Sequence, residues 1–133
     1  MRLVIEGKTI SMVCLAAAGP PVRLEFWGKP VSDLPADYTL EIEGAFELTL
    51  PDSGVRRYNP EDRPHADVTK LLGTRVVSAI ANDDGSLQVS FEDESVLRIP
   101  KADWEPWQLV REGQPIVVSG AGGGLHEWED DSS

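Results

Sequence analysis

The sequence offers few residues that could form a metal site. Its two histidines, His65 and His126, stand far apart along the chain. Two histidines bind a metal when a further ligand, such as the carboxylate of Asp67 or Glu127, lies beside them. Nothing in the spacing of these residues requires such a site. We therefore expect structural or solvent-exposed histidines and no bound metal or other cofactor.

The single cysteine, Cys14, excludes an internal disulfide and a cysteine-based zinc site. It lies in the alternating segment 9–15, and no residue next to it would favour a thiolate. Free cysteines are mostly buried. We therefore expect Cys14 to be a small buried apolar residue and not a nucleophile.

Two segments share features with ligand-binding loops. The run Asn82-Asp83-Asp84-Gly85-Ser86 places Leu87, and not glycine, at the sixth position of a calcium loop, and strand alternation resumes at once. The glycine run 120–124 follows a strand pattern with no helix or lysine after it, unlike a phosphate loop. Both patterns favour turns between strands.

Carboxylates are abundant, and their distribution is uneven. Residues 1–66 carry seven basic and ten acidic side chains, a net charge of −3, whereas residues 67–133 carry five and 13, a net charge of −8. Two predicted turns and two nearby tryptophans could form one acidic, aromatic protein-binding patch: Asp83, Asp84, Glu92, Asp93, Glu94, Trp107 and Trp128. A general contribution to solubility explains the same charge.

The composition excludes several partners. A net charge of −11 opposes direct binding to nucleic acid or to an anionic membrane and suits a basic protein. The longest apolar run, 12–18, is far shorter than the roughly 20 residues that span a bilayer. Glu6 and Lys8 interrupt the apolar residues after Arg2, so we expect no export signal and a cytoplasmic location.

Short alternating segments indicate a strand-rich fold. Glycine and proline divide the chain into apolar stretches of a few residues, typical of antiparallel strands with one wet face. The first half contains candidate strands at 3–5 with 10–15 (a strand or a hairpin turning near Gly7-Lys8), 22–27, 40–43 and 46–50. The second half contains candidates at 75–81, 87–91, 96–100, 107–110 and 115–119.

One short helix is predicted near residues 64–72, after a proline-rich loop at 51–64. Pro64 suits a first helical position and Gly73 a C-terminal one, and Val68, Leu71 and Leu72 would share the face that packs on the sheet. We predict a single mainly β domain at 1–128, an antiparallel sandwich or open barrel, and an acidic tail at 129–133. The two halves are loosely alike, which either a duplication or two ordinary meanders would explain.

Several motifs resemble a family of small, uncharacterised bacterial proteins, a domain of unknown function common in actinobacteria. They lie within residues 38–128: Phe46-Glu47-Leu48-Thr49-Leu50-Pro51-Asp52, Asn59-Pro60-Glu61-Asp62, Leu71-Leu72-Gly73-Thr74-Arg75-Val76, Asp84-Gly85-Ser86-Leu87, Phe91-Glu92-Asp93, Glu105-Pro106-Trp107 and 122–128. The resemblance implies no catalytic residues. The sequence departs from the family pattern at Glu94, where a turn glycine is expected, and at Gly120-Ala121, where a proline is expected.

These observations favour a binding protein without catalysis. Small acidic β-rich proteins of this style are often immunity partners of bacterial toxins, so we expect an inhibitor that blocks a basic toxin by contact. One alternative is a small-ligand-binding β-barrel or minor enzyme with the glycine run at its mouth, and a deep apolar pocket would favour it. Another is a structural subunit of a larger assembly.

Overall fold

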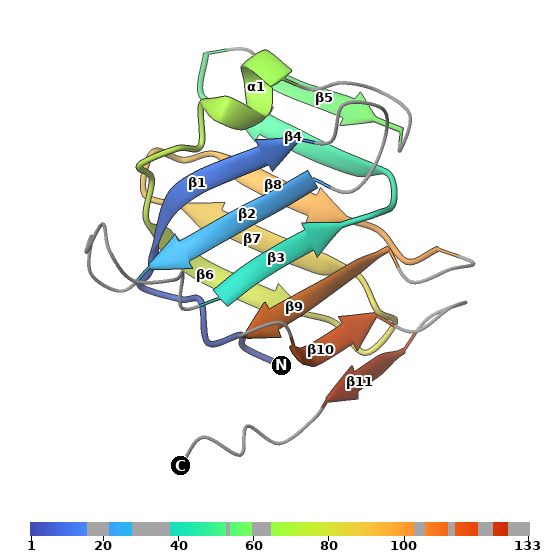
Figure 1. Cartoon of the computed structure of the whole chain (residues 1–133). Coiled ribbons are helices and arrows are strands. Elements are labelled where there is room, and N and C mark those ends of the chain that lie inside the picture. Colours follow the sequence, from blue (N-terminus) through green and yellow to red (C-terminus); the bar gives the residue numbers. More distant parts are fainter. Residues whose placement is uncertain are drawn as a thin grey trace.

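The computed structural model describes residues 1–15, 22–27, 38–52, 54–59, 65–102, 106–111, 114–119 and 124–127. They form two antiparallel sheets that lie one in front of the other (Figure 1). The six-stranded sheet has the order β1 (Thr9–Leu15), β2 (Val22–Trp27), β3 (Tyr38–Ile42), β9 (Trp107–Arg111), β10 (Gln114–Ser119) and β11 (Leu125–Glu127). The five-stranded sheet has the order β5 (Gly54–Tyr58), β4 (Phe46–Leu50), β8 (Val96–Ile99), β7 (Leu87–Phe91) and β6 (Val76–Ala81). The predicted mainly β sandwich with one short helix is confirmed.

Alternating side chains fill the space between the sheets. In β4 and β7 every second residue is buried, as the sequence pattern predicts for strands with one wet face. Phe26, Leu40 and Leu109 from the six-stranded sheet and Leu48 and Val89 from the five-stranded sheet are at most 1% exposed. The core therefore lies between the layers and leaves both outer faces to solvent.

The chain crosses from one sheet to the other between β3 and β4. At this crossing the backbone nitrogens of Glu43 and Gly44 donate to the carbonyl oxygen of Pro106, at 2.8 and 3.0 Å. A Cβ on Gly44 would lie 2.7 Å from the Cβ of Pro106, so this approach requires glycine. The crossing joins the start of β4 to the start of β9.

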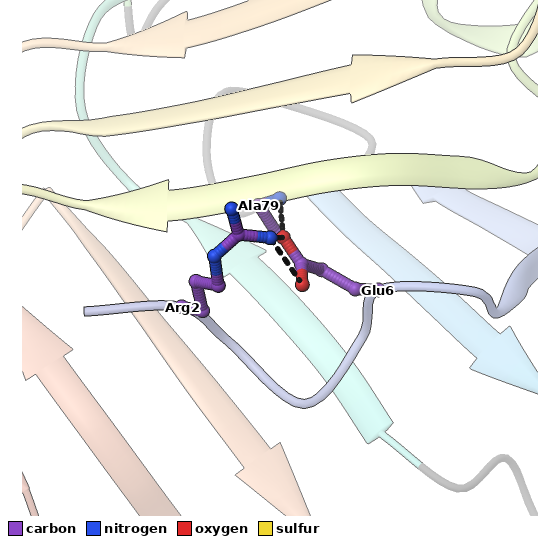
Figure 2. A network of polar contacts seen from close by, with 3 residues as sticks. All are labelled: Arg2, Glu6 and Ala79. Atoms are coloured by element: carbon purple, nitrogen blue, oxygen red, sulfur yellow. Dashed lines mark hydrogen bonds and ion pairs between the residues drawn. The ribbon is translucent and has the colours of Figure 1, made fainter.

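The N-terminal segment covers the edge of the five-stranded sheet at β6. The nitrogens of Leu3 and Gly7 donate to carbonyl oxygens of Ala79 and Val76, at 2.9 and 2.8 Å. Glu6 accepts from the backbone nitrogen of Ala79 at 3.0 Å and pairs with Arg2 at 3.4 Å (Figure 2). This segment satisfies an edge that would otherwise be open to other strands. The predicted strand at 10–15 is present as β1, but residues 3–5 neither extend it nor form a hairpin with it, because residues 4–7 form a turn beside β6.

Helix α1 (His65–Thr69) lies within the predicted helical segment. Val68 and Leu71 are buried as predicted, at 2% and 1% exposure, but Leu72 is 53% exposed. The helix ends at Thr69, and the nitrogens of Leu71 and Leu72 then bond to carbonyls three residues back. This tighter turn rotates Leu72 away from the buried face.

The predicted loop at 51–64 contains a strand, β5. The sequence of β5 shows no alternation of apolar and polar residues, because four of its five residues are exposed. It is held to β4 by an ion pair between Arg57 Nε and Glu47 Oε1 at 2.6 Å, and by the rings of Tyr58 and Phe46, whose centroids are 5.2 Å apart. The Tyr58 hydroxyl also donates to Asp67 of α1, which ties the edge strand to the helix.

Candidate functional site

Asp83 and Asp84 lie in the tight turn that joins β6 to β7. Gly85 N donates to Asn82 O and Asn82 N to Ser86 O, both at 2.9 Å, and Gly85 has a φ of 93°. Asp84 Oδ1 accepts from the Ser86 hydroxyl at 2.6 Å and from Ser86 N at 2.9 Å. These bonds lower the pKa of the Asp84 carboxyl below its ordinary value. The predicted hairpin is therefore present, and its two aspartates are exposed.

Glu92, Asp93 and Glu94 lie in a second turn of the same kind, between β7 and β8. Glu94 N donates to Phe91 O at 3.0 Å, and Phe91 N to Ser95 O at 2.9 Å. Asp93 Oδ1 accepts from Ser95 N at 2.9 Å, as Asp84 does from Ser86. All three carboxylates are exposed.

The structure does not bring the two turns together. They lie at opposite ends of β7, whose five residues span roughly 17 Å at about 3.3 Å per residue. The acidic residues therefore form two sites, one at each end of the strand, and not one continuous patch as expected.

The carboxylates of these turns differ from several others in the described chain, which form ion pairs. Glu47 pairs with Arg57 at 2.6 Å, Glu41 with Arg23 at 3.2 Å and Glu6 with Arg2 at 3.4 Å. In contrast, none of the five turn carboxylates forms an ion pair within the part of the chain that the structure describes: Asp83, Asp84, Glu92, Asp93 and Glu94. Carboxylates without an ion pair are thus concentrated at both ends of β7.

The tryptophans do not complete an exposed patch. Trp107 is 1% exposed, and its indole nitrogen donates to the carbonyl oxygen of Gly85 at 2.9 Å. Its expected role as a contact residue is therefore wrong, because the side chain is buried in the sandwich. Its hydrogen bond to Gly85 instead holds the first acidic turn to the core. Trp128 lies outside the described residues.

Cys14 is half-buried on the outer face of the six-stranded sheet, whereas we expected a buried residue. A β-bulge between Ile10 and Met12 shifts the alternation, so that Ile10 and Val13 face the core and Cys14 faces outward. Burial raises the pKa of the Cys14 thiol, and a hydrogen bond from its sulfur to Glu25 Oε2 at 3.6 Å raises it further. This environment disfavours the thiolate.

The described residues contain no group of three or more histidine, cysteine, aspartate or glutamate side chains placed to hold a metal ion. The side chains of His65 and His126 lie outside the described part of the chain. The expectation about these two histidines therefore stays a prediction.

A shallow pocket of about 320 Å³ lies on the outer face of the five-stranded sheet beside the first acidic turn. Its polar lining comes from Glu47, Asn82, Ser86, Gln88 and Arg98. Arg98 Nε donates to Gln88 Oε1 at 3.0 Å across the pocket wall. Leu87, Ile99 and Pro100 complete the lining, and this open depression of mixed character is not the deep apolar pocket that would favour the ligand-binding alternative.

Comparison of the chain with known protein families matches residues 1–129 to a family of unknown function, DUF6188. The chain belongs to this family. Searches of curated proteins and of solved structures gave no significant match. The resemblance inferred from the sequence motifs is thus confirmed for an uncharacterised family, and the family brings no assigned activity to these residues.

Among the described residues of this DUF6188 member, no helix is long and apolar enough to cross a membrane.

Proposed function

We propose that the protein is a small acidic binding protein of the cytoplasm that neutralises a basic bacterial toxin by direct contact, as an immunity protein does. One observation carries this proposal: the exposed carboxylates without ion pairs are concentrated in the two turns at the ends of β7. Carboxylates that served only solubility would need no such arrangement, and Glu41 and Glu47 on the sheet faces are paired with arginines.

The separation of the turns supports a partner of protein size. A small ligand cannot contact both ends of β7, which lie roughly 17 Å apart. A standard protein interface of about 800 Å² on each side covers both turns with room to spare. Nucleic acid and anionic membranes, the other large binding surfaces, are repelled by the same charge.

Inhibition by such a protein needs no catalysis. A toxin that acts on nucleic acid or another anionic substrate carries a basic cleft, and two acidic turns complement that cleft. Unpaired exposed charges of this kind act mainly on the rate of association, because they attract the partner before contact. The bound protein then excludes the substrate.

The experiment is co-purification from the native host at low and at high salt, followed by mass spectrometry and by stopped-flow association with the purified partner. We expect a basic partner that is lost at high salt. Replacement of Asp83, Asp84, Glu92, Asp93 and Glu94 by lysine should lower the association rate by roughly tenfold or more.

Glu25→Lys serves as the control, since Glu25 is on the outer face of the other sheet. It should change the rate far less per unit of charge than the turn variants do. An acidic or neutral partner, a rate that does not depend on salt, or equal effects of Glu25→Lys and the turn variants would contradict the proposal.

A further inference from the structure

Strand β6 exposes two of its large apolar residues, Val77 and Ile80, although it buries two alanines. Val77 is 58% exposed and Ile80 37% exposed, whereas Ala79 and Ala81 are fully buried. The other strands of this sheet for which all side chains are described bury their leucine, phenylalanine and isoleucine residues. Burial of an isoleucine side chain stabilises a fold more than burial of alanine, so this arrangement lowers the free energy of unfolding.

A β-bulge produces the reversal. The register of β6 against β7 shifts between Val76 and Ser78, which inserts one extra residue, Val77. Without this insertion, strict alternation from buried Val76 would place Ile80 in the core. The bulge turns Ile80 outward instead, and bulges are known to re-aim side chains at functional surfaces.

More apolar side chains are exposed along the edge of the same strand. Met1 is 43% and Val4 52% exposed, and both belong to the N-terminal segment that bonds to β6. Four of the seven large apolar residues that are exposed in the described chain thus lie on β6 or on this segment. The network of Arg2, Glu6 and Ala79 fixes the segment against the strand (Figure 2).

Both acidic turns lie at the ends of this strand. At its start, Arg75 O accepts from Glu92 N of the second turn at 2.9 Å. At its end, Ala81 leads directly into the first turn, which carries Asp83. An apolar centre between two charged ends is the usual anatomy of a protein interface.

We propose that the basic partner docks on the outer face of β6, with Val77 and Ile80 at the centre and the two acidic turns at the rim. This inference rests on the proposed function and names the surface and the partner chemistry that it uses. The partner presents apolar side chains flanked by arginine or lysine. A second copy of this chain is a poor occupant, because it brings its own unpaired carboxylates against those of the first.

The test uses three synthetic peptides of equal length and records amide chemical shifts of the full chain by NMR. One peptide alternates arginine and leucine, the second is all arginine, and the third alternates glutamate and leucine. We expect the arginine–leucine peptide to shift Val77, Ile80 and both turns. The all-arginine peptide should shift the turns alone, and the glutamate–leucine peptide should shift neither.

A matched pair of variants sharpens the test. Val77→Ser with Ile80→Ser should weaken binding of the arginine–leucine peptide roughly fivefold or more, because apolar burial is lost, and leave all-arginine binding unchanged. Val55→Ser is the control: Val55 is 61% exposed on the same sheet, on the strand at the opposite edge. It should change either affinity less than about twofold.

The outcomes separate the two proposals. If all-arginine shifts the turns but the arginine–leucine peptide leaves Val77 and Ile80 unmoved, the docking face is wrong and the basic partner stands. If neither basic peptide shifts the turns, both proposals fail. The peptide maps on the unmodified chain decide between these outcomes even where the double variant does not fold.

Discussion

Glu94 occupies the position in the second acidic turn that Gly85 occupies in the first. Their φ angles are 75° and 93°, and each donates its backbone nitrogen to the carbonyl three residues back. Residues other than glycine rarely adopt this left-handed conformation, since their Cβ approaches the backbone too closely. One turn is therefore relaxed and the other strained.

Replacement of Glu94 by glycine should relieve this strain. We expect Glu94→Gly to raise the free energy of unfolding by about 0.5 to 1 kcal/mol, after the greater freedom of glycine in the unfolded chain is subtracted. The reciprocal change, Gly85→Ala, should lower it by about 1 to 2 kcal/mol. Urea unfolding followed by circular dichroism measures both. A Glu94→Gly variant less stable than the unmodified chain would contradict the argument.

Trp107 should matter to the first acidic turn as well as to the core. Trp107→Phe removes the bond from the indole nitrogen to Gly85 O and leaves a small void, so we expect a loss of roughly 2 to 3 kcal/mol. Amide resonances of Asp83 and Asp84 should also shift. Phe46→Leu is the control, because Phe46 is buried but is not bonded to the turn. It should destabilise the fold without moving those resonances.

The ionisation of Asp84 should depend on Ser86. The hydroxyl and backbone nitrogen of Ser86 hold the pKa of Asp84 below its ordinary value, so the turn is stabilised above that value and loses this support as the pH falls. We expect Ser86→Ala to raise the Asp84 pKa toward its ordinary value in an NMR titration. Ser90→Ala, a change on the neighbouring strand β7, should leave it unchanged.

Cys14 should react slowly with alkylating reagents near neutral pH. Burial and the bond to Glu25 raise the pKa of its thiol, and the thiolate is the reactive form. Glu25→Gln removes the nearby negative charge and should speed alkylation at a fixed pH, with the pH profile displaced downward. A profile that does not move would show that Glu25 has no part in the raised pKa.

The regular part of the fold was predictable because its signals are local. Alternation in β4 and β7 and the Asp-Gly turn after β6 can each be recognised from a few neighbouring residues, whereas the unusual Glu94 was marked by the family resemblance. The left-handed φ of Glu94 agrees with the expectation that glycine belongs at this position.

What the sequence did not reveal depends on contacts between distant segments. The bulges in β1 and β6 displace Cys14 and Ile80 by one position each, and no local pattern marks an extra residue. Strand β5 is mostly exposed and lacks an alternating pattern. Only its pairing with β4 identifies it as a strand, so the sequence predicts a loop there. Trp107 has acidic neighbours in the sequence, but its side chain is buried in the apolar core.

The separation of the acidic residues into two groups follows from the same limitation. In the sequence, Asp83 and Glu94 are separated by only a few residues, which suggests one patch. Because β7 is extended, the residues between them carry one turn away from the other. A helix of equal length would have kept them within one face, about half as far apart.

The pairing of β3 with β9 also constrains when the protein can fold during synthesis. Thr39 pairs with Val110 and Ile42 with Trp107, so the centre of the six-stranded sheet joins segments that leave the ribosome at very different times. Strands β4 to β8 pair only with one another, so they can associate before β9 leaves the ribosome. Until β9 emerges, β3 has an unpaired edge and the six-stranded sheet lacks three of its strands, β9, β10 and β11. The nascent chain therefore passes through a stage in which part of the apolar core is still exposed. A chaperone that binds apolar surface would bind most readily at this stage.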